Sequence, residues 1–258
     1  MRSILRARPV AVEELAERYE VSLSTVRRDL ATLSADGEVV RTYGGALAPA
    51  PGEQSLHERE HLALRQKEAI AREAERLVSP GDLLLLDAGT TVGALAARLA
   101  AHDEITVVTN GLTTMHALED AAGVELVLLG GSIRHVSLGM VGPLAEAAMA
   151  DITADVVFLG ADGVTADRGV CEGTAEQASL KRAMVAGADS VVVLADASKL
   201  GVARSHYWTR IERPWTLITD DGAGEVQLAP FRDRPEVEVR VVGTTRGQVA
   251  DPGAGVTG

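Results

Sequence analysis

Apolar residues near the start of the chain recur at helical spacing. Residues 12–19 are predicted to form a short amphipathic helix, and a tight turn at residues 20–21 separates it from a second helix. Ser22 is a suitable N-cap for this second helix, which runs to about Ala35 and is ended by Gly37. The positions expected to face a common core are Leu15 and Ala16 on the first helix and Val26, Leu30 and Leu33 on the second.

A short hairpin is predicted over residues 38–45, which completes the pattern of a winged helix-turn-helix. The outer face of the second helix carries hydroxyl and guanidinium groups, and the hairpin adds an arginine, a tyrosine and two glycines. A helix that enters the major groove of DNA presents such groups to phosphates and base edges. The candidate DNA-binding residues are Ser22, Ser24, Thr25, Arg27 and Arg28 on the helix, and Arg41, Tyr43, Gly44 and Gly45 in the hairpin.

The charge balance limits how this segment could bind DNA. Residues 1–47 hold seven arginines and seven acidic residues, so the net charge of −12 lies in the rest of the chain. Non-specific affinity for nucleic acid comes from phosphate neutralisation, which a neutral segment does not provide. Two interpretations remain: a dimer that binds a specific site through a few well-placed arginines, or a helix face that is merely solvated.

Short apolar runs alternate with helical stretches along the remainder of the chain. This alternation predicts a doubly wound α/β fold, with a largely parallel sheet covered by helices on both faces. The apolar runs are residues 83–86, 105–108, 125–129, 156–159, 191–194, 217–218 and 237–242, and the helical stretches between them are residues 92–101, 113–121, 143–150 and 175–188.

Four segments follow from these patterns. Residues 1–47 form the winged helix-turn-helix domain, residues 48–54 a linker rich in proline, glycine and small residues, and residues 55–246 the α/β domain. Residues 247–258 lack apolar periodicity and are expected to be disordered. At the start of the α/β domain one amphipathic helix is predicted over residues 55–78, with the buried positions Leu62, Ile70, Ala71, Ala74 and Leu77.

Polar or glycine-rich loops follow five of the apolar runs. The carboxyl ends of parallel strands meet at one edge of a sheet, where ligands bind. The loops, each named by its first and last residue, are Asp87–Thr91, Thr109–Gly111, Gly130–Arg134, Gly160–Gly163 and Asp196–Lys199.

The first of these loops has the chemistry of an anion site. Gly89 permits a close backbone approach, and a helix begins at once at Thr90 and Thr91, so free N–H groups are available. Lys199 and Arg134 could add positive charge. A glycine–threonine turn can merely cap a helix, but five polar loops at one edge favour a small pocket for a phosphorylated polyol or sugar. Sugar hydroxyls would be bound by Asp87, Asn110 and Asp162.

Composition excludes several other classes. Hydrophobic residues make up 46% of the 258 residues but aromatic residues only 3%, so a core of alanine, valine and leucine is expected. No stretch approaches the roughly 20 apolar residues of a membrane span, and no signal-peptide pattern occurs. The single Cys171 forms no internal disulfide, which is consistent with the cytoplasm. Six scattered histidines lack ligand spacing, so neither a metal site nor a cofactor is expected.

Both parts of the chain resemble the DeoR family of bacterial transcriptional regulators. The run Val12–Gly45 is similar to the family's DNA-binding head, including the Ser22 and Thr25 hydroxyls and the Arg-Arg-Asp-Leu motif at residues 27–30. The remainder resembles its C-terminal sensor domain, to about Val242. The matching motifs there begin at Asp87, Thr109, Gly130, Gly142, Phe158, Thr174, Lys181, Asp196 and Ile218.

The resemblance implies a sensor domain related in fold to ribose-5-phosphate isomerase and glucosamine-6-phosphate deaminase. In the family this domain senses phosphorylated sugars or related metabolites and governs oligomerisation and operator binding. By resemblance, Gly89, Thr90 and Thr91 would hold the phosphate. The remaining effector-binding candidates are Asp87, Asn110, Gly130, Gly131, Arg134, Asp162, Glu176, Lys181 and Lys199. Lys181 has an alternative role on a solvated or ion-paired helix face, unless its helix closes over the pocket.

The head departs from the family pattern in two places. Glu20 stands at the corner between the helices, where a permissive residue is usual; a left-handed backbone there would cost about 1–2 kcal/mol. The family's first helix is also longer, and only Ile4 and Leu5 match it before Pro9. We therefore expect a shortened first helix.

The favoured function is a DNA-binding repressor of a sugar or carbohydrate operon, controlled by a phosphorylated sugar. It would bind double-stranded operator DNA as a dimer or higher homo-oligomer, without membrane contact or catalytic residues. The alternative is a sugar-phosphate isomerase or amino-sugar deaminase with Asp87, Asp162 or Glu176 as the base. A third possibility is a sensor that has lost DNA binding through its shortened first helix.

Overall fold

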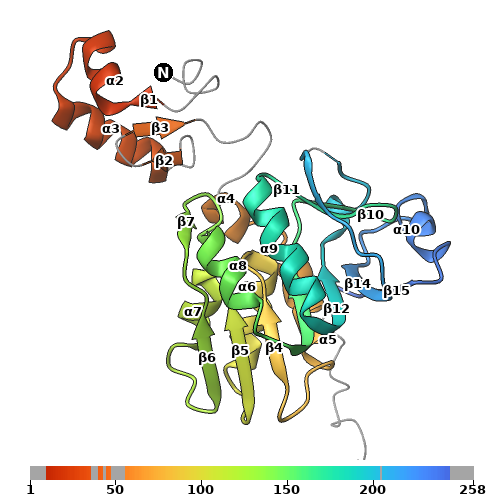
Figure 1. Ribbon diagram of the computed structural model, residues 1–258. Helices are drawn as coiled ribbons and strands as arrows, with labels where there is room; N and C mark the ends of the chain where they lie inside the picture. The colour runs from red at the N-terminus through yellow and green to blue at the C-terminus, as the bar shows by residue number, and fades with distance from the viewer. Residues whose placement is uncertain (1–9, 36–39, 43–44, 48–55, 204, 245–258) are drawn as a thin grey trace, which may run out of the picture.

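The computed structural model describes residues 10–35, 40–42, 45–47, 56–203 and 205–244 (Figure 1). The head, up to residue 47, and the body, from residue 56, each have their own core. Residues 48–54, proposed as the linker, and residues 247–258, proposed as the tail, lie outside the described residues.

The head is a winged helix-turn-helix, as the sequence predicted. It consists of β1 (Val10–Ala11), α2 (Val12–Tyr19), α3 (Leu23–Ala35), β2 (Val40–Thr42) and β3 (Gly45–Leu47), and the strands pair antiparallel in the order β1-β3-β2. The five predicted core positions are confirmed: Leu15, Val26 and Leu30 are buried, and Ala16 and Leu33 pack against them. Ile4, Leu5, Tyr43 and Gly44 lie outside the described residues.

The corner between α2 and α3 has a left-handed backbone at a residue with a side chain. Glu20 has φ 53° and ψ 41°, and its N–H donates to the carbonyl of Glu17. The next amide, that of Val21, donates to the carbonyl of Ala16. The two bonds end α2 at a conformational cost of about 1–2 kcal/mol. Ser22 caps α3 as predicted, because its Oγ accepts from the N–H of Thr25 at 3.1 Å.

A parallel sheet of seven strands forms the centre of the body. In spatial order its strands are β15 (Val237–Val242), β14 (Trp215–Asp220), β12 (Ala188–Leu194), β9 (Ala154–Leu159), β4 (Leu83–Leu86), β5 (Ile105–Thr109) and β6 (Val124–Leu128). All seven predicted runs are strands of this sheet. The chain adds strands outward on one side of β4 and then continues with β9 on the other side, so the strand order reverses between β4 and β9. This reversal places the usual ligand crevice of a doubly wound sheet between them.

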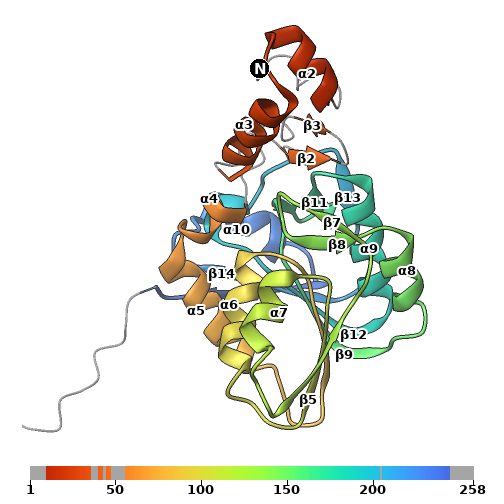
Figure 2. The ribbon, with the colours of Figure 1, turned by 90° about the vertical axis from the view of Figure 1, so that its left-hand side faces the viewer.

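Helices cover both faces of the sheet, as predicted. The helices α5 (Leu64–Glu75), α6 (Thr90–Leu99) and α7 (Leu112–Leu118) pack on one face, whereas α8 (Pro143–Met149), α9 (Ala175–Ala186) and α10 (Glu225–Arg232) pack on the other (Figure 2). Alternate strand residues enter the two cores: Leu84 and Leu86 enter the first, and Leu85 the second. Most buried side chains are alanine, valine and leucine, consistent with the low aromatic content.

Three small features at the carboxyl edge of the sheet were not predicted. The strands β7 (Ser132–Arg134) and β8 (Gly139–Val141) form a hairpin, and β10 (Gly163–Thr165), β11 (Gly169–Glu172) and β13 (Tyr207–Thr209) form an antiparallel sheet. A short 3₁₀ helix, η1, spans Ala197–Lys199. These strands are of three or four residues, too short for a period in the sequence to reveal them.

The prediction of one helix over residues 55–78 was wrong. The chain forms α4 (Leu56–Glu60) and α5, separated by a turn in which Ala63 has φ 51°. The Leu62 side chain, predicted to be buried, is 46% exposed, whereas the predicted core positions Ile70, Ala71 and Ala74 are buried. The sequence holds no glycine or proline at this turn. Instead, tertiary contacts hold α4, because the N–H of Leu56 donates to the carbonyl of Val136 at 2.8 Å.

We expect Leu84→Ala to lower the free energy of unfolding of the body by about 2–5 kcal/mol, because Leu84 is fully buried in the central strand β4. Urea unfolding followed by tryptophan fluorescence measures this, since both tryptophans, Trp208 and Trp215, lie in the body. Val226→Ala, at a position on α10 that is 91% exposed, is the control and should change stability by no more than about 0.5 kcal/mol. Equal effects of the two changes would contradict the burial of β4.

Candidate functional site

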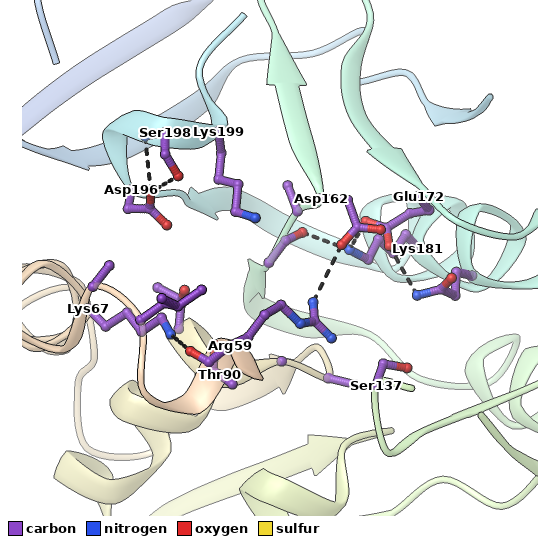
Figure 3. Close-up of a pocket in the computed structure, with 18 residues that line it drawn as sticks. Arg59, Lys67, Thr90, Ser137, Asp162, Glu172, Lys181, Asp196, Ser198 and Lys199 are labelled. Carbon is purple, nitrogen blue, oxygen red and sulfur yellow. Dashed lines mark hydrogen bonds and ion pairs between the residues drawn. The ribbon is translucent and has the colours of Figure 1, made fainter. Parts of the chain in front are cut away.

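A pocket lies at the reversal of strand order, beyond the carboxyl ends of β4 and β9 (Figure 3). The space that it spans, counted together with its open mouth, is about 660 Å³. Its walls come from five parts of the chain: α4 and α5, the loop from β4 into α6, the loop after β9, the pair β11 and α9, and η1 after β12. Ser137, between β7 and β8, also lines it.

The loop from β4 into α6 forms one end of the pocket. Gly89 is the N-cap of α6 with φ 147° and ψ 165°, a backbone conformation that favours glycine. Its carbonyl accepts from the N–H of Gly93 at 2.8 Å, which starts the helix and leaves the amides of Thr90 and Thr91 without a partner inside the helix. Asn110 holds the loop, since its Oδ1 accepts from the N–H of Ala88 at 2.9 Å. The result is a helix N-terminus that opens into the pocket.

Two lysines, Lys67 and Lys199, also line the pocket. Lys67 of α5 is buried, and its Nζ donates to the carbonyl of Arg59. Burial lowers the pKa of Lys67 to about 8, an effect partly offset by the carboxylate of Asp196 and reinforced by Arg59. Lys199, at the end of η1, is half-buried and points toward the middle of the pocket in Figure 3. Both lysines therefore contribute positive charge to the pocket into which the α6 N-terminus opens.

A buried ion cluster centred on Lys181 forms the opposite wall. The Nζ of Lys181 lies 2.9 Å from Asp87 Oδ2, contacts Glu172 Oε1, and donates to the carbonyl of Gly160 at 2.7 Å. An ammonium group has three donors, so Lys181 has none left for a ligand. The nearby Gln177 donates through Nε2 to Glu172 Oε2 at 3.2 Å. Glu172 and Gln177 are therefore the polar groups of this wall that remain close to a ligand.

Burial and the neighbouring charges shift the pKa values of the groups in this cluster. Burial raises the pKa of Glu172 to about 8, and the neighbouring Asp162 and Asp87 carboxylates reinforce the shift while the Lys181 ammonium opposes it. Burial alone would lower the pKa of Lys181, but the carboxylates of Asp87 and Glu172 together raise it above its usual value. The carboxylates thus hold Lys181 in its charged form, while burial favours the neutral form of the Glu172 carboxyl group.

Arg59 of α4 crosses the pocket toward the loop after β9. Its Nη1 lies 3.4 Å from Oδ1 of Asp162, a residue 103 positions later in the chain. Within the described residues, Nε and Nη2 of Arg59 and Oδ2 of Asp162 are buried and have no hydrogen-bond partner. These atoms are the buried polar groups at the pocket with unused hydrogen-bonding capacity.

Six of the predicted effector-binding residues line the pocket: Gly89, Thr90, Thr91, Asp162, Lys181 and Lys199. Asp87 and Asn110 lie behind its surface, where Asp87 pairs with Lys181 and Asn110 holds the loop at Ala88. The helix that carries Lys181 contributes to the wall of the pocket, where Lys181 is ion-paired, while its neighbour Arg182 stays exposed and donates to the carbonyl of Trp208.

Four predicted effector-binding residues lie outside the pocket lining: Gly130, Gly131, Arg134 and Glu176. Gly131 has φ 142°, and a Cβ there would come within 2.6 Å of the carbonyl oxygen of Val141, so it is required by the β7–β8 hairpin. Arg134 belongs to the same hairpin, and Glu176 is exposed in the first turn of α9.

Sequence reasoning missed seven polar residues of the pocket: Arg59, Lys67, Ser137, Glu172, Gln177, Asp196 and Ser198. Asp196 and Ser198 stand in a predicted loop and could have been included. Glu172 ends a buried strand that its four residues do not reveal. Arg59 and Lys67 were treated as outward charges of one continuous helix, and nothing in their spacing indicates otherwise. Among the described residues, no group of three histidine, cysteine, aspartate or glutamate side chains could hold a metal ion, and no helix is long and apolar enough to cross a membrane.

The candidate DNA-binding residues of the head lie at the start of α3. Ser22, Ser24, Arg27 and Arg28 are exposed and Thr25 is half-buried. Ser22 Oγ lies 2.7 Å from Ser24 Oγ and 2.8 Å from Thr25 Oγ1, so the three hydroxyls form one cluster. Arg41 lies in β2 and Gly45 begins β3.

Comparisons with known proteins match both parts of the chain. The family described as the DeoR C terminal sensor domain matches residues 63–221, and the DeoR-like helix-turn-helix domain matches residues 2–51. A protein of Escherichia coli O157:H7 named as an aga operon transcriptional repressor is 35% identical over 238 residues, which are 91% of this chain and 88% of that one. The glycerol-3-phosphate regulon repressor of Escherichia coli (strain K12) is 31% identical over 193 residues, 74% of this chain and 77% of that one.

Solved structures also resemble the chain. Ribose 5-phosphate isomerase A from Methanocaldococcus jannaschii has a TM-score of 0.39 and 20% identity, and the match covers 52% of each chain.

The raised pKa of Glu172 leads to a pH-dependent stability. Because the folded pKa exceeds the unfolded value of 4.5, the contribution of Glu172 to stability is full below that value and is lost as the pH rises through about 8. Glu172→Gln keeps the shape and stays neutral. We therefore expect the stability of the natural protein, relative to this variant, to fall between about pH 5 and about pH 8.5. Urea unfolding followed by tryptophan fluorescence measures it, and a pH-independent difference would contradict the assignment.

Proposed function

Because the chain belongs to the DeoR family of bacterial transcriptional regulators, we propose that it represses a sugar or carbohydrate operon under the control of a phosphorylated sugar. The helix-turn-helix domain makes it a DNA-binding protein and the sensor domain gives it an effector site. The relatives are named regulators, so the expectation of a regulator and not an enzyme is confirmed.

The proposed effector site is the pocket between β4 and β9, and this assignment is based on one observation. The N-terminus of α6 opens into a pocket that also receives Lys67 and Lys199. A helix N-terminus with nearby cations favours a phosphate group. On this proposal Gly89, Thr90 and Thr91 bind the phosphate, as the sequence suggested. Asp162, Glu172 and Gln177 are then positioned for the hydroxyls of the sugar, with Asp87 and Lys181 holding them in place.

The isomerase or deaminase alternative loses two of its three candidate bases. Asp87 is bonded to Lys181 and also accepts from the N–H of Gly160 at 3.1 Å. Asp162 is paired with Arg59, and Glu176 is exposed outside the pocket lining. Asp87 is therefore held by protein partners and Glu176 lies away from the pocket, so that of the three candidates only Asp162 lines it.

The proposed DNA interface is the start of α3 together with the wing. We propose that Ser24, Thr25, Arg27 and Arg28 enter the major groove, and that Ser22, Arg41, Tyr43, Gly44 and Gly45 contact the phosphates beside it. The head has no net positive charge to hold DNA on its own. A dimer or higher homo-oligomer on a two-fold symmetric operator would supply the missing affinity, because two heads then bind at once.

We expect Arg27→Ala and Arg28→Ala each to weaken operator binding by about tenfold or more, since a base-contacting arginine contributes about 1–3 kcal/mol. Fluorescence anisotropy of labelled DNA from upstream of the chain's own operon, at one stated salt concentration, measures this. Arg72→Ala removes the same charge from an exposed position of α5 and should leave DNA affinity unchanged. Operator affinity retained in both head variants would exclude α3 as the recognition helix. If the natural protein binds no operator either, the hypothesis of a sensor that has lost DNA binding gains support.

We expect Thr90→Val to weaken the binding of a sugar phosphate by about tenfold, because it removes a hydrogen bond to a charged group at nearly constant volume. Isothermal titration calorimetry with ribose 5-phosphate, glucosamine 6-phosphate, glycerol 3-phosphate and inorganic phosphate measures the affinity. Thr113→Val makes the same chemical change on α7, outside the pocket, and serves as the control. An unchanged dissociation constant in Thr90→Val would place the phosphate elsewhere.

A further inference from the structure

The α4 segment contributes a charged side chain to the pocket although it lies outside the α/β sheet. The Arg59 side chain is only 15% exposed and points into the pocket between Thr90 and Asp162 (Figure 3). Of its five donors, only those on Nη1 reach a protein acceptor among the described residues, at the long distance of 3.4 Å. Nε and Nη2 are buried and unpartnered. A buried guanidinium in this condition gains free energy from any oxygen that it can bind.

The attachment of α4 to the body depends on few contacts. The helix has five residues, too short to be stable alone. Leu56 is its buried apolar anchor, and the N–H of Leu56 donates to the carbonyl of Val136. Among the described residues, Arg59 adds two bonds, through its side chain to Asp162 and through its carbonyl to Lys67. Segments with so few buried contacts open at low free-energy cost.

The contacts of α4 matter for the DNA-binding head because of where this helix lies in the chain. It is the first described element of the body, and residues 48–55 connect it to β3 of the winged head. The turn that follows is held at Ala63 in the left-handed region, where a residue with a side chain is strained. Any change in how firmly α4 is held therefore acts on the chain that leads to the DNA-binding domain.

We propose that Arg59 is an effector-binding residue. By binding an oxygen of the sugar phosphate, its side chain holds α4 against the body. Binding of the effector in the pocket thereby changes how firmly the chain that leads to the head is held. This proposal rests on the proposed effector site. A ligand bound between Arg59 and the α6 N-terminus favours the state in which α4 is docked, which is the differential affinity that control of DNA binding requires. The fork of Nε and Nη2 donors matches two oxygens of a phosphoryl group or of a sugar diol.

Hydrogen exchange of the full chain tests the proposal, with mass spectrometry of two peptides, one covering residues 56–63 and one covering residues 88–92. The probes are ribose 5-phosphate, glucosamine 6-phosphate, glycerol 3-phosphate and inorganic phosphate. In the natural protein we expect a bound probe to slow exchange in both peptides, by about fivefold or more. In Arg59→Gln the slowing should disappear from residues 56–63 and persist at residues 88–92 when the probe is saturating. Arg59→Lys, which keeps the charge but loses the fork, should behave in the same way.

The matched control is Arg65→Gln, the same loss of charge at an exposed position of α5. It should leave both peptides as in the natural protein. Operator affinity with saturating probe provides a second measurement. Thr90→Val should keep the full effect of the probe on operator affinity once its weaker binding is saturated, whereas Arg59→Gln should lose most of it.

The outcomes separate this proposal from the proposed function. Slowing at residues 88–92 without slowing at residues 56–63 in the natural protein would overturn the role of α4 and leave the effector site standing. The role of Arg59 would also be overturned if the probe affected hydrogen exchange and operator affinity in Arg59→Gln as strongly as in the natural protein. If no probe affects either peptide, both the effector site and the role of Arg59 are refuted.

Discussion

The buried ammonium group of Lys181 joins parts of the body that are far apart in sequence. It comes from α9 and binds Asp87 after β4, Glu172 at the end of β11 and the carbonyl of Gly160 after β9. A buried charge is tolerated only where partners compensate its desolvation, and breaking such a cluster typically costs about 3–5 kcal/mol. Because each partner stands at the carboxyl edge of the sheet, the ion cluster sets the distance between the β4 loop, the β9 loop and α9. The shape of the pocket follows from this spacing.

The reversal of strand order explains why the pocket lies where it does. Strands on the two sides of β4 and β9 lead their connections to opposite faces, so the loops after these two strands diverge and leave a crevice. The α6 N-terminus forms one end of the crevice and the ion cluster the opposite wall. Such a division suits a molecule with an anionic group at one end and hydroxyl groups at the other. The α4 segment contributes Arg59 to the lining of the crevice and is joined to the head by residues 48–55 of the chain.

The elements that depend on local sequence were predicted well. The helix Val12–Tyr19 was predicted to the residue, and Ser22 was identified as the cap of α3, because periodicity and capping act within a few neighbours. The seven sheet strands were found because strands buried on both faces are apolar throughout. The sharp turn at Ala63 was missed, because no glycine or proline signals it and the contacts of Leu56 and Arg59 hold α4.

The sequence by itself determined the winged helix-turn-helix, the parallel sheet and the sheet edge at which the pocket lies. Each of these follows from apolar periodicity and from the rule that parallel strands share one carboxyl edge. Only the tertiary structure decided which polar residues meet at that edge. It brought Arg59 to Asp162 and Lys67 into the pocket that the α6 N-terminus also lines. It placed Gly131 in the hairpin and Glu176 on the surface. The physical reason is that these pairings depend on how the chain turns between distant segments, and no local pattern of residues encodes that turn.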